Sequence, residues 1–290
     1  MTNLIFGGDP EYFASYKENG LDYVVPPVHF RTKLGIKPLV EDKKHPIFFD
    51  IDGLKIHEDG VALEVAIRPQ KSVTDLHLGF IHAIDIMKDF VGKYGYDIYA
   101  KPTINFDVDK YNDESDDFLM CLLFGCDRDY DAWNYNEVQD IIDVLHHPYR
   151  YGGGHLHISG AKVFKDNPID CIRMCSITIG NYVVGNSKYP ELEKQRTFNY
   201  GKPGKFRFQE YGKLFDNIPD TDIGIEYRTP SNTWTTDPEM AKGIEYWAYK
   251  MLEIMETGKA DSIIKEFGRD TIDGILSANQ NKCKSILEAL

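Results

Sequence analysis

A glutamate in the middle of an apolar segment is the feature that most constrains this chain. Residues 60–68 read GVALEVAIR, and the spacing of their small and apolar side chains predicts a strand that buries Glu64. A buried carboxylate must be paired, bound to a metal or protonated, because an isolated charge loses its hydration. Glu64 is therefore the strongest single candidate for a functional residue.

Other carboxylates and histidines also stand in short strand-like segments beside glycines. Residues two apart on a strand share a face, which predicts three same-face pairs: Asp9 with Glu11 in GGDPE, His155 with His157 in GGGHLHISG, and Glu226 with Arg228 in GIEYRTP. Together with Glu64, the oxygen ligands predict a site for Mg²⁺ or Mn²⁺, and an imidazole excludes neither ion. Taken singly, Asp9 before a proline could shape a turn, and the histidines could be hydrogen-bonded strand residues.

A basic segment interrupts this acidic protein. Residues 196–213 (RTFNYGKPGKFRFQEYGK) hold five Lys and Arg and one Glu, whereas the whole chain has a net charge of −13. Such a segment can close over a polyphosphate and neutralise its charge. Arg207, between two phenylalanines on a predicted strand, is the strongest candidate for a phosphate contact. For Lys202 and Lys213, a solvated loop that balances charge is an equally good interpretation.

Three further segments carry weaker signals. The glycines of residues 152–154 would let a ligand approach the backbone, although the chain has neither a dinucleotide-binding nor a Walker-type glycine pattern. Residues 107–117 are acidic but lack the glycine and the final glutamate of an EF-hand loop, so they are predicted to form a solvated loop. In residues 125–133, Asp127 and Asp129 could contact substrate or cap a turn.

The pattern along the chain predicts an α+β fold in one domain of residues 1–290, with no repeat or linker. Strands are expected at residues 4–6, 60–68, 99–106, 118–124, 155–159, 205–211 and 223–228. Helices are expected at residues 74–94, with Ser72 or Thr74 as N-cap, and at residues 136–145, 169–184, 238–255 and 260–290. Polar residues on one face of several strands favour an antiparallel or mixed sheet beside a cleft.

Composition narrows the range of partners. The net charge of −13 disfavours nucleic acid and anionic membranes. No segment has the roughly 20 apolar residues of a membrane helix, and residues 1–13 do not resemble a signal peptide. Five irregularly spaced cysteines do not predict a disulfide framework, and Cys171 and Cys175 are expected to be buried thiols. The cytoplasm is the expected compartment.

The chain resembles the phage-type carboxylate–amine (COOH-NH2) ligases, or amidoligases, of the glutamine synthetase and glutamate–cysteine ligase superfamily. The resemblance lies in six ordered segments: GGDPE, DGVALEVAI, GCDRDYDAW, RYGGGHLHISG, YGKPGKFRFQEYG and GIEYRTPSNTW. It runs from residue 7 to residue 234 and leaves the expected helices of residues 237–290 uncovered. It implies a curved, mainly antiparallel sheet of the glutamine synthetase catalytic type, with helices packed on its convex face.

The resemblance also implies that ATP and two Mg²⁺ ions, or Mn²⁺ in their place, bind the concave face of the sheet. The metal ligands that it implies are Asp9, Glu11, Glu64, His155 and Glu226. It places His157 and Arg207 on the nucleotide, to which the basic segment adds Lys205 and the glycine run adds Gly153 and Gly154. The arginines expected in the catalytic centre are Arg150, Arg207 and Arg228.

The implied reaction uses ATP to join a carboxylate to an amine through an acyl phosphate. The substrates would be small molecules or peptides, in the host cytoplasm if a phage encodes the chain. The alternatives are a metal-dependent hydrolase, which needs no basic segment, and a non-catalytic phage structural or assembly protein that keeps the fold. The sequence leaves open the acyl donor, the amine acceptor, the general base, the adenine site and the oligomeric state.

Overall fold

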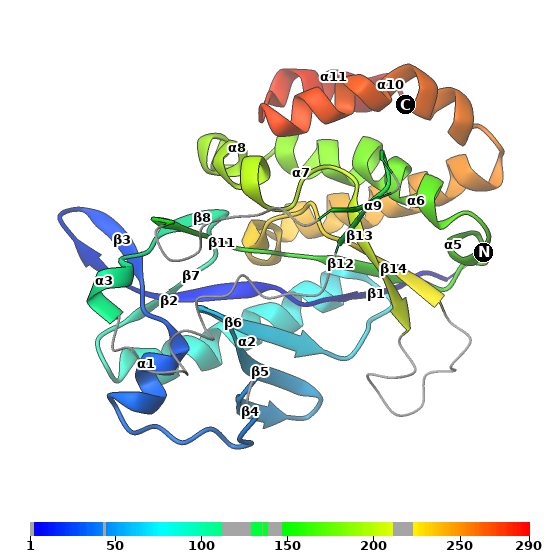
Figure 1. The fold of residues 1–290 in the computed structure, drawn as a ribbon. Coiled ribbons are helices and arrows are strands. Elements are labelled where there is room, and N and C mark those ends of the chain that lie inside the picture. Colours follow the sequence, from blue (N-terminus) through cyan, green and yellow to red (C-terminus); the bar gives the residue numbers. More distant parts are fainter. Residues whose placement is uncertain (1–2, 43–44, 112–128, 135, 139–146, 211–222) are drawn as a thin grey trace.

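The computed structural model describes residues 3–42, 45–111, 129–134, 136–138, 147–210 and 223–290 (Figure 1). The described chain combines helices with strands that pair mostly antiparallel. This arrangement confirms the predicted α+β class. None of the described helices is long and apolar enough to cross a membrane.

The strands are short. The strands before residue 110 are β1 (Ile5–Gly8), β2 (Glu11–Glu18), β3 (Leu21–Val24), β4 (Ile47–Ile51), β5 (Leu54–Asp59), β6 (Ala62–Ile67), β7 (Asp97–Tyr99) and β8 (Thr103–Asn105). The later strands are β9 (Asp129–Asp131), β10 (Asn136–Val138), β11 (Tyr149–Tyr151), β12 (Leu156–Ser159), β13 (Lys205–Glu210) and β14 (Ile223–Tyr227).

The described helices differ widely in length, and the longest are α2, α9 and α10. The α-helices are α1 (Pro27–Thr32), α2 (Val73–Gly92), α3 (Val108–Tyr111), α5 (Val163–Asp166), α6 (Pro168–Cys175), α7 (Asn181–Gly185), α8 (Pro190–Asn199), α9 (Pro238–Glu256), α10 (Ala260–Leu276) and α11 (Gln280–Glu288). A π-helical turn, η1 (Ser176–Gly180), joins α6 to α7, and a 3₁₀ turn, η3 (Asn232–Thr236), precedes α9.

The described strands form two hydrogen-bonded sheets, where the family resemblance implied one. The first sheet has the order β1-β12-β14-β13-β9-β10. The second has the order β11-β8-β3-β2-β6-β5-β4, with β7 beside β2. Among the described strands, β3 and β8 form the one parallel pair.

The chain crosses between the sheets at residues 9–10 and again at residues 152–154. β1 pairs with β12 in the first sheet up to Gly8, and β2 pairs with β6 in the second sheet from Glu11 onwards. Pro10 suits this break because a proline cannot donate a hydrogen bond to a strand ladder. The glycine run makes the second crossing, from β11 to β12, and Glu11 N–H donates to Gly153 O at 2.9 Å. The two crossings therefore lie side by side.

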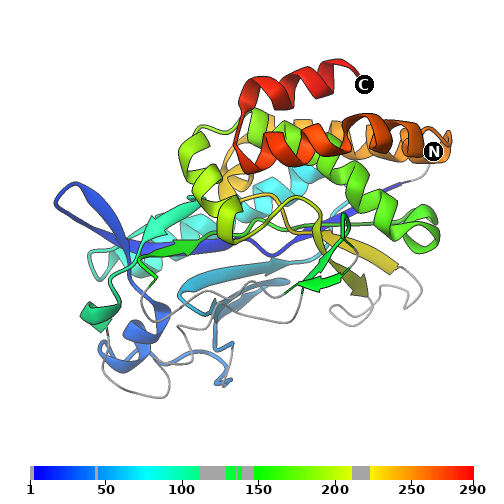
Figure 2. The ribbon, with the colours of Figure 1, turned by 45° about the horizontal axis from the view of Figure 1, so that its top comes forward.

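Helices α6 to α11 gather on one side of β1, β12 and β14, and β4 to β6 lie on the other side (Figures 1 and 2). Helix α2 packs against α9, and its N-cap is Ser72, one of the two residues predicted for this role; Ser72 Oγ accepts from Asp75 N–H. Trp234 of η3 is fully buried, meets Phe80 of α2 edge-on at 5.7 Å, and donates to Gly154 O. This packing fixes the glycine run against the core.

Four predicted elements differ from the structure. The helix predicted at 260–290 is divided into α10 and α11, with a turn at residues 277–279. Residues 136–138 form β10, paired with β9, and not the start of a helix at 136–145, because a pairing partner overrides weak local periodicity. The strand predicted at 99–106 is divided into β7 and β8, with Pro102 between them. The loop predicted at 107–117 contains α3. The strand predicted at 118–124 lies outside the described residues. Cys171 and Cys175 are buried, as predicted.

Candidate metal centre

The described residues form two clusters of potential metal ligands, and the first lies where β1, β12 and β14 run side by side. This first cluster consists of Asp9, His157 and Glu226, whose ligand atoms all lie within 4.8 Å of one another. His157 and Glu226 are directly opposite each other across β12 and β14, and Asp9 follows β1. Asp9 Oδ1 lies 3.3 Å from His157 Nε2 and 3.1 Å from His155 Nδ1. Three neighbouring strands thus supply one ligand set.

Charge in the first cluster is set by its cationic neighbours. Burial opposes ionisation of Asp9, but the imidazoles of His155 and His157 hold its pKa well below the usual range. Burial likewise opposes ionisation of Glu226, and the Arg228 guanidinium lowers its pKa. Asp9 Oδ1 is buried, and its polar neighbours among the described residues are the two imidazoles. A divalent cation would satisfy this oxygen and both ionised carboxylates.

The second cluster consists of Glu11, Asp59 and Glu64, whose ligand atoms also lie within 4.8 Å of one another. Glu11 and Glu64 face each other across β2 and β6, and Asp59 ends β5. Burial and the surrounding carboxylates, Asp9 and Asp59 first, raise the pKa of Glu64 well above its ordinary value. Burial also raises the pKa of Glu11. Three acids this close need either protons or a cation.

Both donor sets fit divalent cations. The first cluster offers two carboxylates and an imidazole, and the second offers three carboxylates. His57 lies beside the second cluster, with Nε2 at 2.9 Å from Glu64 Oε1, directly opposite Glu64 across β5 and β6. Carboxylate oxygens suit Mg²⁺ and Mn²⁺, and an imidazole in the set is compatible with Mn²⁺. Sequence reasoning missed Asp59 and His57 because neither stands in an apolar segment that makes a charge conspicuous.

The predicted metal ligands are thus divided between the clusters. Asp9 and Glu226 belong to the first cluster, and Glu11 and Glu64 belong to the second. His155, the fifth, lies beside the first cluster, but its Nδ1 is also 3.1 Å from Arg228 Nη1. His157, which the resemblance assigned to the nucleotide, is the imidazole that completes the compact set.

Among the described residues, Arg207 and Arg228 lie beside the first cluster. Arg228 forms an ion pair with Glu226, and Arg207 is opposite Glu226 across β13 and β14. The Nε atoms of Arg207 and Arg228 both lie 3.0 Å from Asp129 Oδ1. Asp129, whose role the sequence left open, therefore aligns the two guanidinium groups. They form a basic pair next to the cation ligands, where an anion such as phosphate can bind.

The glycine run is required by the site's own packing. Gly153 N–H donates to Glu11 Oε2 at 2.7 Å. A Cβ on Gly153 would lie 2.5 Å from His155 Nε2, and one on Gly154 would overlap the carbonyl oxygen of Ser231. Both glycines were predicted to contact a nucleotide. The structure gives each a place against the chain itself, which accounts for a glycine at both positions.

The other described Lys and Arg residues of the basic segment do not share the surroundings of Arg207. Arg196, at the start of the basic segment, is fully buried and donates to Gly152 O, Thr229 O and Pro230 O. Arg196 therefore holds the backbone of two loops together. Lys205 is buried, and Arg228 N–H donates to its carbonyl oxygen. Lys213 and Asp127 lie outside the described residues.

Arg150 lies in β11 of the second sheet, where it pairs with Ile104 of β8. Its Nη1 donates to the carbonyl oxygens of His147 and Tyr149, and its guanidinium lies 4.2 Å from the centre of the Phe106 ring. These contacts hold Arg150 in the second sheet. In contrast, Arg207 contacts Asp129, and Arg228 contacts both Asp129 and the first cluster.

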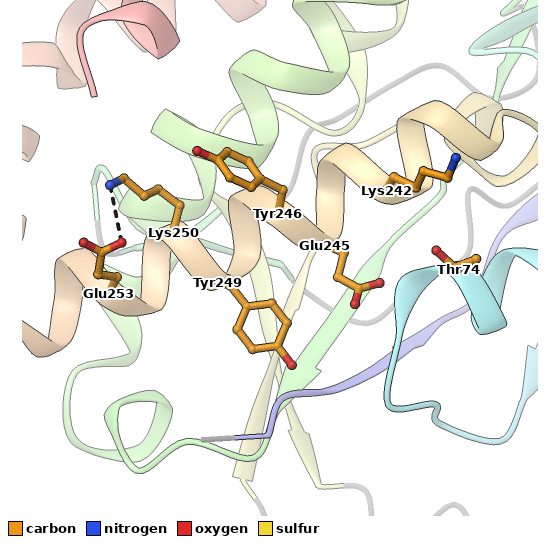
Figure 3. Close-up of a pocket in the computed structure, with 7 residues that line it drawn as sticks. All are labelled: Thr74, Lys242, Glu245, Tyr246, Tyr249, Lys250 and Glu253. Atoms are coloured by element: carbon orange, nitrogen blue, oxygen red, sulfur yellow. Dashed lines mark hydrogen bonds and ion pairs between the residues drawn. The ribbon is translucent and has the colours of Figure 1, made fainter. Parts of the chain in front are cut away.

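A cavity of about 550 Å³ lies on the surface of α9 (Figure 3). Its walls contain none of the cluster residues; they are Thr74, Lys242, Glu245, Tyr246, Tyr249, Lys250 and Glu253. Glu245 Oε2 accepts from Val73 N–H and so holds the start of α2, and Lys250 pairs with Glu253 at 3.3 Å. Glu245, Lys250 and Glu253 are thus used in holding a helix or in a surface ion pair.

Comparisons with known proteins do not indicate a function, so the chemistry is inferred from the site itself. No family model matches the chain, and a search of curated proteins finds no match. The two clusters and the arginine pair are the observations from which a function is inferred.

Proposed function

We propose that this protein is an ATP-dependent carboxylate–amine ligase that works with two divalent cations. The observation that carries the proposal is the pair of neighbouring clusters, with Arg207 and Arg228 beside the first. Two cations flanked by arginines supply the positive charge that phosphoryl transfer requires. The ordered sequence resemblance supports the same proposal, including a fold of the glutamine synthetase catalytic type.

The chemistry follows from the need to activate a carboxylate, whose charge and resonance resist attack by an amine. Transfer of the terminal phosphoryl group of ATP to a carboxylate oxygen gives ADP and an acyl phosphate. The amine nitrogen then bonds to the acyl carbon and releases a proton to water, and phosphate leaves with the electrons of the broken C–O bond. Bound cations would neutralise phosphate oxygens. Arg207 and Arg228, aligned by Asp129, would hold the transferred group in line.

Calorimetric titration with ATP, with and without Mg²⁺, tests the binding part of the proposal. We expect Mg²⁺-dependent binding to the wild type, and at least about tenfold weaker binding to Glu64→Gln, which removes a charged ligand of the second cluster. The matched control is Asp50→Asn, since Asp50 lies on β4 of the same sheet but is 43% exposed and pairs with Lys55. Folded wild type that binds no ATP would contradict the proposal.

Product analysis separates the ligase from the alternatives. A ligase releases ADP and phosphate in equal amounts when a carboxylate and an amine are both present, and amino acids and short peptides are the first substrates to screen. A metal-dependent hydrolase would cleave its substrate without ATP. A non-catalytic protein would bind nucleotide or cation without turnover of any pair.

A further inference from the structure

The hydroxyl group of Tyr200 contacts one residue of the second cluster and two residues that lie beside the first cluster. Its oxygen lies 3.2 Å from Glu11 Oε1, in the second cluster. It also lies 3.0 Å from His155 Nε2 and 3.1 Å from Arg228 Nη2, and both of these residues adjoin the first cluster. Tyr200 follows α8, so this contact comes from outside the strands that carry the ligands.

Two of these hydrogen bonds have a fixed direction. Arginine only donates, so Arg228 Nη2 donates to the Tyr200 oxygen. The Tyr200 hydroxyl donates its single proton to Glu11 Oε1. The third contact is with Nε2 of His155, whose Nδ1 lies 3.1 Å from both Asp9 Oδ1 and Arg228 Nη1.

Glu11 is consequently held at both carboxylate oxygens. Tyr200 donates to Oε1, and Gly153 N–H donates to Oε2 at 2.7 Å. We propose that Tyr200 is a positioning residue that couples the two cation clusters, by fixing Glu11 of the second cluster to His155 and Arg228 beside the first. This inference rests on the proposed two-cation function and adds a residue to it.

A substitution can remove the hydroxyl group of Tyr200 and keep its ring. The Tyr200 ring stacks on Tyr151 at 6.5 Å, with 14° between the ring planes, and lies under the Arg196 guanidinium at 5.1 Å. Tyr200→Phe keeps these contacts and deletes the three hydroxyl contacts. Tyr151→Phe is the matched control, because it removes a hydroxyl from the same stack whose described contacts are with Asn199 and His147.

The test is Mn²⁺ binding to the full chain, by calorimetry and by electron paramagnetic resonance. We expect two ions per wild-type chain, with a spin–spin interaction between them. Tyr200→Phe should bind the second ion about tenfold more weakly and show an altered interaction, and Tyr151→Phe should match the wild type. A Tyr200→Phe variant with wild-type affinities and spectrum would overturn the inference alone. Wild type with fewer than two ions would overturn the proposed two-cation function as well.

A measurement on the wild type covers the case in which Tyr200→Phe does not fold. Nuclear magnetic resonance spectra of the cation-free wild type report how fast the Tyr200 hydroxyl proton exchanges with water. We expect this proton to be protected from exchange, because it is donated to Glu11 Oε1. A Tyr200 hydroxyl proton that exchanges freely would overturn the proposal.

Discussion

At the scale of single residues, two acids separated by one proline have opposite electrostatic surroundings. Asp9 faces two imidazoles, which lower its pKa against the effect of burial. Glu11 faces Asp59 and Glu64, and burial raises its pKa. The difference arises because the chain changes sheet between them. Each acid therefore serves a different cluster.

The raised pKa of Glu64 predicts how the stability of the cation-free protein depends on pH. Above its ordinary value of 4.5, the native state keeps a proton that the unfolded chain has lost, so stability falls as pH rises towards the native pKa. Glu64→Gln should remove the contribution of Glu64 to this pH-dependent loss of stability. Between about pH 5 and about pH 8 in EDTA, we expect the free energy of unfolding of Glu64→Gln to fall by about 1 kcal/mol less than that of the wild type.

Urea unfolding at several pH values measures this difference, with Asp50→Asn as the control that keeps the wild-type slope. A smaller fall should remain in Glu64→Gln, because the pKa values of Glu11 and His157 are also raised. Parallel curves for the wild type and Glu64→Gln would show that Glu64 ionises normally in the fold.

At the scale of elements, the continuous segment of α6, η1 and α7 depends on one glycine. The sequence predicted a helix at 169–184, and the structure confirms it but widens one turn at η1. Gly180, the last residue of η1, lies against the buried Tyr227 ring and Ile275. The hydrophobic pattern predicted the helix, but not this contact, because the contact depends on β14 and α10 arriving at the same point.

Gly180→Ala should therefore be destabilising. Its Cβ would overlap the Tyr227 hydroxyl and lie 2.9 Å from Ile275 Cδ1, so we expect a loss of about 1–3 kcal/mol in the free energy of unfolding. Gly92→Ala, at the end of α2, has no atom within 4 Å of the new Cβ and should be neutral or stabilising by up to about 1 kcal/mol. Equal melting temperatures for the two variants would contradict this account of η1.

At the scale of the whole molecule, the clusters lie at the junction of the two sheets, so cation binding should stabilise the complete fold. An ion at about 100 times its Kd adds about 2.7 kcal/mol to the free energy of unfolding for each site. We expect saturating Mn²⁺ to raise the melting temperature by roughly 5–10 °C over EDTA. Glu64→Gln and Glu226→Gln, one from each cluster, should each lose about half of this rise. Identical melting curves with Mn²⁺ and EDTA would argue against both sites.

The sequence predicted most of the potential metal ligands, but it did not predict how they are divided between the two clusters. Asp9, Glu11, Glu64 and Glu226 were noticeable because each is a charge in an apolar or glycine-rich strand, where local pattern is informative. Asp59 and His57 become important only through β5 pairing with β6. Tyr200 is one of 18 tyrosines, and no local pattern separates it from the others. Contacts between residues distant in sequence, which no local pattern reveals, bring these side chains together.

The two neighbouring crossings between sheets have a mechanical consequence. Glu11 and Gly153, one at each crossing, are tied by two hydrogen bonds, Glu11 N–H to Gly153 O at 2.9 Å and Gly153 N–H to Glu11 Oε2 at 2.7 Å. Any rotation of one sheet against the other would be smallest at this doubly tied point. The spacing of the two clusters, which adjoin it, would therefore change less than the positions of the outer strands.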